Sequence, residues 1–85
     1  MEMMKLGIFQ RLDQQRQLDL AMSRGVYLMD YCKYNVVVRL FQLDRFYAEV
    51  YSRSDDGEVI MIHGFEDTRY LEPYLERLEL PAFFN

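Results

Sequence analysis

The stretch FYAEVYSRSDDGEVIMIHGF, residues 46–65, decides the fold, because it predicts two strands joined by a short turn. Both flanks are rich in Val, Ile, Tyr and Phe, which are enriched in strands. Between them, Asp55-Asp56-Gly57 is typical of a three-residue hairpin loop whose glycine takes the left-handed conformation. This loop pairs Ser54 with Glu58. The pairs further along the two strands are then Val50 with Ile62, Glu49 with His63, and Ala48 with Gly64.

A two-residue turn, Asp56-Gly57, is the alternative, and it would place Val50 opposite His63 and Glu49 opposite Gly64. A slip of one residue turns every side chain of a strand to the other face of the sheet. Because the three-residue loop keeps apolar and polar side chains on separate faces, we predict that loop.

The preceding hairpin can be treated in the same way. A three-residue loop at residues 43–45 sets Arg39 against Glu49, whereas a two-residue loop, Asp44-Arg45, places Arg39 beside Val50 on the apolar face. Burying an unpaired guanidinium group is costly, so we predict the three-residue loop. It also pairs Val38 with Val50 and Leu40 with Ala48. The expected core face then consists of Val38, Leu40, Phe46, Ala48, Val50, Ile60 and Ile62.

The first hairpin leaves two registers open. A three-residue loop at residues 33–35 would send Val26, Leu28, Asp30 and Cys32 toward the core. A two-residue loop, Tyr34-Asn35, would instead send Tyr27, Met29 and Tyr31 inward and would pair Asp30 with Arg39.

Helical patterns lie on both sides of the strands. Leu6, Phe9 and Leu12 have helical spacing, and Asp13 is placed to cap a helix over residues 14–24 that Gly25 ends as a left-handed residue. A second helix is predicted over residues 71–79. Its apolar stripe is Leu71, Leu75 and Leu78 with Tyr74 beside it, Pro81 stops it, and residues 82–85 are expected to pack on the core.

The strands are expected over residues 26–32, 36–42, 46–53 and 58–65. Turns this short leave no room for crossovers, so neighbouring strands must be antiparallel. The predicted fold class is therefore α+β: a four-stranded antiparallel β-meander with an N-terminal helix and a C-terminal helix packed on it. The chain has 85 residues, no repeat and no linker, so we expect one domain over residues 1–85.

The outer face of this predicted sheet is unusual, because aromatic side chains surround a charged row of Arg39, Glu49 and His63. Such a face is normally polar. It is either covered, by the N-terminal segment, the C-terminal tail or a second copy, or it binds a ligand or partner. In a third interpretation, Glu49 orients His63 as a general base. The candidate binding residues are Arg39, Phe41, Tyr47, Glu49, Tyr51, Met61 and His63.

Composition makes several classes of function unlikely. The net charge is −4 and the arginines are spread along the chain, which disfavours binding to nucleic acid. Cys32 is the one cysteine and His63 the one histidine, so no internal disulfide and no ordinary zinc site are expected, and no glycine-rich phosphate loop is present. We expect no cofactor, no metal site and no membrane segment. Cys32 should be a buried structural thiol in a reducing, cytoplasmic setting.

These features favour a small cytoplasmic protein-interaction or binding domain, homodimeric and without catalytic activity. Homodimerisation is expected because a core this small is marginal on its own. The alternatives are an acidic, antitoxin-like inhibitor that binds a basic protein, and a small enzyme that uses His63 and Glu49. The layout itself is shared by many unrelated proteins and does not imply a function.

Overall fold

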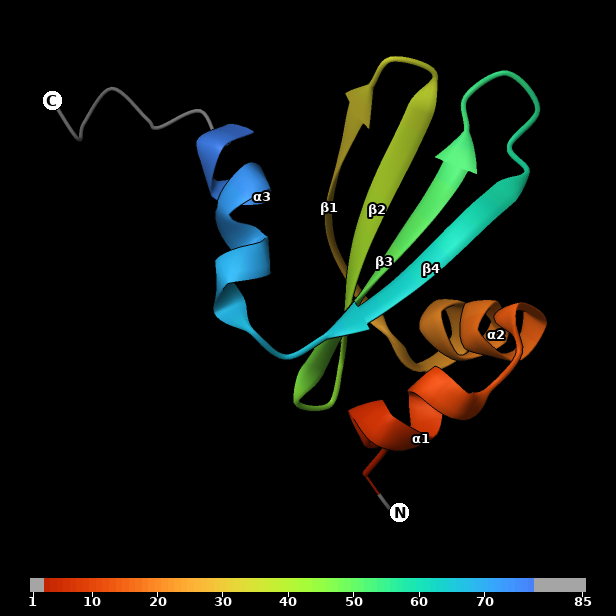
Figure 1. The fold of residues 1–85 in the computed structure, drawn as a ribbon, viewed down its shortest axis with the longest axis vertical. Helices are drawn as coiled ribbons and strands as arrows, with labels where there is room; N and C mark the ends of the chain where they lie inside the picture. Colours follow the sequence, from red (N-terminus) through yellow and green to blue (C-terminus); the bar gives the residue numbers. More distant parts are fainter. Residues whose placement is uncertain (1–2, 78–85) are drawn as a thin grey trace, which may run out of the picture.

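Four consecutive strands form one antiparallel sheet in order β1-β2-β3-β4 in the computed structural model, which describes residues 3–77 (Figure 1). Two helices precede the sheet, and a 3-10 turn and a third helix follow it. The elements are α1 (Leu6–Arg11), α2 (Gln14–Arg24), β1 (Val26–Lys33), β2 (Val36–Leu43), β3 (Phe46–Arg53), β4 (Val59–Phe65), η1 (Thr68–Leu71) and α3 (Glu72–Arg77). The predicted α+β meander is confirmed.

The helices lie on opposite sides of the sheet. The α1 and α2 helices contact β4, and α2 also contacts β2, whereas α3 contacts β1 from the other side (Figure 1). Each side has its own buried cluster: one around Phe9, Ala21 and Phe46, the other around Leu40 and Tyr74. Helices therefore pack on both faces, as the interpretation of a covered outer face allowed. What differs is the cover: α3, which was expected on the predicted core face, packs on the predicted outer face.

The predicted register between β2 and β3 is also wrong. Leu43 pairs with Phe46 across the two-residue loop Asp44-Arg45, so Arg39 lies opposite Val50 and not opposite Glu49. Asp44 adopts a φ of 54°, the left-handed conformation that a tight hairpin turn requires. Its carboxylate also accepts a hydrogen bond from the backbone N–H of Met4 at 2.6 Å, which ties the N-terminal segment to this turn.

The cost that argued against this register does not arise, because Arg39 is exposed. The α1 and α2 helices lie against one end of the sheet only, so part of this face stays uncovered (Figure 1).

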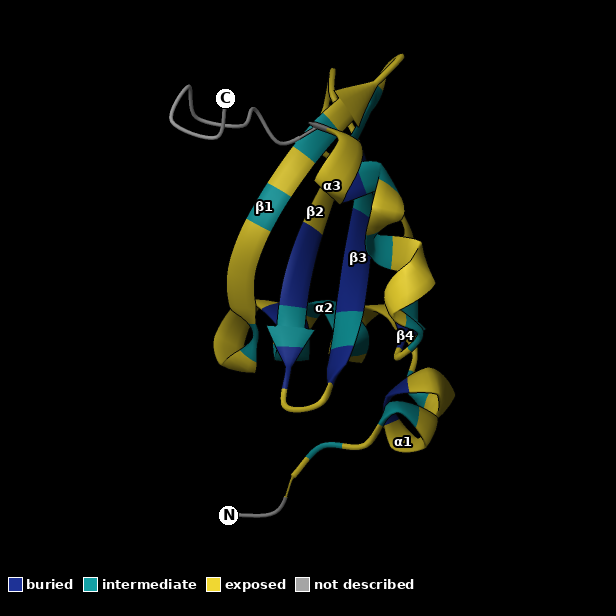
Figure 2. Cartoon of the chain, turned by 90° about the vertical axis from the view of Figure 1, so that its left-hand side faces the viewer, coloured by how far each residue is buried: buried dark blue, intermediate teal, exposed yellow. Residues whose placement is uncertain are grey.

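The one-residue shift divides the expected core face between the two clusters. Val38 and Leu40 belong to the cluster under α3, while Phe46, Ala48 and Val50 belong to the cluster under α1 and α2. Most of β3 and the second half of β2 are buried, because helices pack on both faces of these strands (Figure 2).

The register between β3 and β4 is as predicted over most of its length, with Ala48 opposite Gly64, Glu49 opposite His63 and Val50 opposite Ile62. The turn itself differs. Arg53 N–H donates to the Glu58 carbonyl, so the loop has four residues, and Gly57 is left-handed with φ 75°. Ser54 therefore does not pair with Glu58.

A β-bulge at Ile60 restores the predicted register. Ser52 pairs with Val59 but Tyr51 pairs with Met61, so Ile60 is an extra residue in β4. The bulge turns its side chain out to solvent, and the expectation that Ile60 belongs to the core is wrong.

The first hairpin uses the two-residue loop Tyr34-Asn35, with Asp30 opposite Arg39. Met29 and Tyr31 pack with the cluster under α3, as that register implies. A second bulge, at Leu28, reverses the strand's faces beyond it, so Tyr27 lies opposite Phe41 on the other side of the sheet.

The helix over 14–24 begins and ends where predicted, and the Asp13 carboxylate accepts from the Arg16 backbone N–H at 2.9 Å. The predicted role of Gly25 is wrong, because its φ of −76° is not left-handed. A Cβ at Gly25 would stand 2.5 Å from the Ala21 carbonyl oxygen and 3.2 Å from Phe41 Cβ, so glycine is needed for close packing of α2 on β2.

Tyr74 is the buried residue that anchors the C-terminal helix. Tyr74 is 1% exposed and Leu71 packs partly buried in the same cluster, whereas Leu75 is 61% exposed, so Leu75 of the predicted stripe does not face the sheet. Leu78, the stop at Pro81 and the tail 82–85 lie outside the described residues. Among residues 3–77, no helix is long and apolar enough to cross a membrane.

Candidate functional site

A buried carboxylate lies at the centre of the sheet face under α3. Glu49 on β3 is one of two buried polar or charged residues in the described chain. Its Oε2 accepts a hydrogen bond from Tyr74 Oη at 2.6 Å, and its Oε1 accepts from Tyr51 Oη at 3.4 Å and contacts His63 Nδ1 at 2.9 Å. Charge-assisted hydrogen bonds of this kind offset the cost of burying a carboxylate.

His63 connects this buried carboxylate to solvent. The Glu49 side chain is 6% exposed and that of His63 is 37% exposed. An ionised Glu49 can only accept, so its contact keeps a proton on Nδ1 and leaves Nε2 of the neutral ring as an acceptor. The neutral ring can therefore accept a hydrogen bond at Nε2.

Aromatic rings fix the position of His63. Its ring stacks on Phe65, with the centroids 5.4 Å apart, and meets Tyr70 edge to face at 5.3 Å. Phe65 in turn stacks on Tyr47 at 5.4 Å. These contacts leave the imidazole little freedom to turn away from Glu49.

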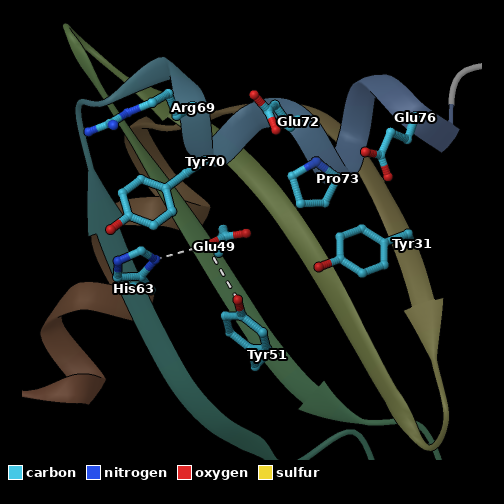
Figure 3. Close-up of a pocket in the computed structure, with 9 residues that line it drawn as sticks. All are labelled: Tyr31, Glu49, Tyr51, His63, Arg69, Tyr70, Glu72, Pro73 and Glu76. Atoms are coloured by element: carbon cyan, nitrogen blue, oxygen red, sulfur yellow. Dashed lines mark hydrogen bonds and ion pairs between the residues drawn. The ribbon is translucent and has the colours of Figure 1, made fainter.

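A pocket of about 370 Å³ opens above this pair. In Figure 3, Tyr70 lies over His63 on one side, Tyr31 stands on the opposite side, and Glu49 and Tyr51 lie between them. The segment that carries Glu72, Pro73 and Glu76 crosses above the hollow (Figure 3). The described lining contains no Ser, Thr or Cys, so it offers no hydroxyl or thiol nucleophile other than the tyrosines.

Burial, together with the Glu49 carboxylate, raises the pKa of both tyrosines that donate to Glu49. Burial and the negative charge of Glu49 raise the pKa of Tyr51 to about 12. Burial, followed by the hydrogen bond to Glu49, raises the pKa of Tyr74 further. Both phenols therefore stay protonated at neutral pH and act as donors.

The rim of the pocket carries more negative than positive charge. Glu72 and Glu76 form no ion pair among the residues that the structure describes. Arg69 is the cation of the lining, and its guanidinium is held by the Asp67 carboxylate, with Nη2 2.5 Å from Oδ2. In Figure 3 the Arg69 side chain points away from the hollow.

The structure divides the residues of the predicted binding face. Five of the seven lie on the sheet face under α3: Tyr47, Glu49, Tyr51, Met61 and His63. Arg39 and Phe41 lie on the opposite face, because the register of β2 is shifted. The predicted charged row is thus reduced to Glu49 and His63, and Arg39 instead lies opposite Asp30 of the edge strand β1.

Sequence reasoning missed Tyr74, which donates to Glu49, and it also missed further residues that line the pocket: Tyr31, Arg69, Tyr70, Glu72, Pro73 and Glu76. Tyr31 could have been found, because the two-residue first loop places it opposite Val38. The residues after β4 carried no comparable signal, since nothing in their spacing indicates which face of the sheet the helix covers.

A second surface feature lies on β1, which forms one edge of the sheet. Three consecutive apolar residues are exposed there: Val26 at 62%, Tyr27 at 51% and Leu28 at 44%. Cys32, further along the same strand, is also exposed, so the expectation of a buried thiol is wrong.

Within residues 3–77 no group of three or more His, Cys, Asp or Glu side chains could hold a metal ion. No protein-family model, curated protein or solved structure matches this chain.

Proposed function

We propose that this protein is an interaction domain that binds a second copy of itself through the edge strand β1. The observation that carries the proposal is the exposed apolar run Val26-Tyr27-Leu28 on an edge strand, which pairs with β2 on one side only. Consecutive exposed apolar residues are costly in a soluble domain unless they have a function. An edge strand also presents backbone N–H and C=O groups that another strand can pair with.

A second copy of the chain fits this edge well. Two β1 strands paired in antiparallel fashion across a two-fold axis present the same residues to each other, which closes the assembly as a dimer. Dimerisation would also bury more apolar surface, which would help to stabilise a domain whose two hydrophobic clusters are small. Function then lies in binding and not in catalysis.

The opposite edge of the sheet is a poorer candidate. The α1 and α2 helices contact β4, and Gln14 Nε2 donates to the Val59 carbonyl at 3.3 Å. Helices and side chains that cover β4 in this way hinder its pairing with a strand of another chain.

We also place the domain in the cytoplasm. The support is the exposed Cys32 thiol, because a free, accessible thiol persists best in a reducing compartment.

The test is the oligomeric state over a range of concentrations, measured by sedimentation equilibrium on matched variants. Leu28 and Ile60 are both exposed apolar residues at bulges of edge strands, one at each edge. We expect a dimer for the wild type and for Ile60→Asp, and a monomer for Leu28→Asp. A wild type that stays monomeric at high concentration, or an effect of Ile60→Asp without one of Leu28→Asp, would overturn the proposal.

A further inference from the structure

We infer that the pocket above Glu49 is a binding site for an organic cation, a guanidinium or ammonium group carried on a flexible chain. The inference is independent of dimerisation, because the pocket is built from the sheet face under α3 and not from the outer edge of β1.

The first support is the shape and lining of the pocket. Its volume of about 370 Å³ is in the range of small-molecule sites. Aromatic rings stand on two sides, Tyr70 above His63 and Tyr31 across from them (Figure 3). A cation is attracted to the face of a tyrosine ring, and a guanidinium plane also stacks on it.

The second support is charge. Three carboxylates line the pocket, Glu49 at its base and Glu72 and Glu76 on the segment that crosses it. The one arginine of the described lining is neutralised by Asp67 and points outward. A ligand that enters between the rings therefore meets negative charge at the base and at the rim, which favours a cation over a neutral or anionic group.

The third support is preorganisation. Glu49 is held by Tyr74, Tyr51 and His63 before any ligand arrives, and the His63 ring is held by Phe65 and Tyr70. Side chains fixed in this way lose little conformational entropy when a ligand binds, which favours the affinity of a small ligand.

The test uses three probes that share one backbone: Nα-acetyl-arginine methylamide, the corresponding lysine compound, and the neutral isostere with citrulline. Binding is followed at low salt by amide chemical shifts, because exposed charges are screened at high ionic strength. We expect a dissociation constant on the order of 1 mM for arginine, lysine or both, with shifts at His63 and Tyr70, and binding at least about tenfold weaker for citrulline. The ratio of the first two probes tells which cation the pocket prefers.

Two variants locate the site. The double variant Glu72→Gln with Glu76→Gln should weaken cation binding by about threefold to tenfold, and Tyr70→Leu by a similar factor. The control, Asp55→Asn with Glu66→Gln, makes the same change in net charge away from the pocket and should leave the dissociation constant within about twofold of the wild type. Thermal unfolding of each variant verifies that it is folded.

Three results would overturn the inference: equal binding of citrulline and arginine, no binding of either cation, or loss of affinity in the control as large as in the pocket variants. The monomeric variant Leu28→Asp should bind the cation as the wild type does, so failure of the dimer proposal and failure of this one are distinguishable.

Discussion

Glu49 is the residue on which the face under α3 depends. A carboxylate at this position must be buried, because α3 covers it, and it must be hydrogen-bonded, because a buried and unpaired charge is strongly destabilising. Tyr74 meets both needs at once: its ring closes the cluster and its hydroxyl donates to Glu49.

We predict that Glu49→Ala lowers the free energy of unfolding by ~1 to 3 kcal/mol, since it leaves buried donors without an acceptor. Urea unfolding followed by circular dichroism measures the change. Glu66→Ala is the control, because Glu66 is exposed, and its effect should stay within about 0.5 kcal/mol. Equal effects of the two substitutions would show that the buried network contributes nothing.

Alkaline pH should destabilise the protein through Tyr51. Its pKa is about 12 in the folded chain against an ordinary value of 10.0, so between these two pH values the unfolded chain loses a proton that the folded chain retains. Stability is therefore fully present below pH 10 and falls as the pH rises toward 12. Unfolding midpoints measured from pH 8 upward should decline for the wild type and decline less steeply for Tyr51→Phe. A parallel decline of both proteins would contradict the assignment.

At the level of elements, the turns explain which parts of the fold the sequence predicts. Asp55-Asp56-Gly57 carries the strongest turn signal, and the β3–β4 register that it predicts is correct although the loop is one residue longer. The bulge at Ile60 offsets the difference, and no local pattern marks that bulge. Because the pairing of Glu49 with His63 depends on this hairpin alone, that part of the site was predictable.

The other two hairpins turn at left-handed residues that are not glycine, Tyr34 and Asp44. Such positions carry a weak sequence signal, so the choice of loop had to rest on burial. The two-residue loop was rejected because it would bury the Arg39 guanidinium, which assumes that helices cover the whole of that sheet face. The α1 and α2 helices cover only one end of it and Arg39 is exposed, so the burial cost does not arise (Figure 1). Which face of the sheet α3 covers likewise depends on tertiary packing. For that reason the segment that crosses the pocket, with Glu72, Pro73 and Glu76, could not be predicted from the sequence.

Two glycines test the packing of the helices. We predict that Gly25→Ala destabilises the protein by more than about 1 kcal/mol, because the added Cβ would meet the Ala21 carbonyl and Phe41. Gly7→Ala is its control: no atom lies within 4 Å of a Cβ there, and alanine in a helix should stabilise by about 0.5 to 1 kcal/mol. Opposite signs in thermal unfolding are the expected result. A neutral Gly25→Ala would mean that α2 does not approach β2 this closely.

In the molecule as a whole, one sheet separates two small hydrophobic cores, and the two cores differ in how many buried side chains the covering helices supply. The core under α1 and α2 includes Phe9, Ala21 and Phe46, and Gln17 Nε2 links its two helices by donating to the Phe9 carbonyl at 2.9 Å. The core under α3 depends on Tyr74 and on the partly buried Leu71 from the covering segment. The second core should therefore open more readily than the first.

This inequality leads to a prediction for hydrogen exchange. The amides of α3 should exchange at least about tenfold faster than those in the centres of β2 and β3, because Tyr74 is the one fully buried side chain with which the described part of α3 packs on the sheet. Tyr74→Ala should speed exchange in η1 and α3 and abolish cation binding at the pocket while the centre of the sheet stays protected. Phe9→Ala is the matched control on the other face, and it should lower protection throughout the chain, since removing a buried phenylalanine costs ~3 to 5 kcal/mol of the total stability. If Tyr74→Ala instead lowers protection equally in all elements, the two cores unfold as one unit and the pocket cannot open independently of the sheet.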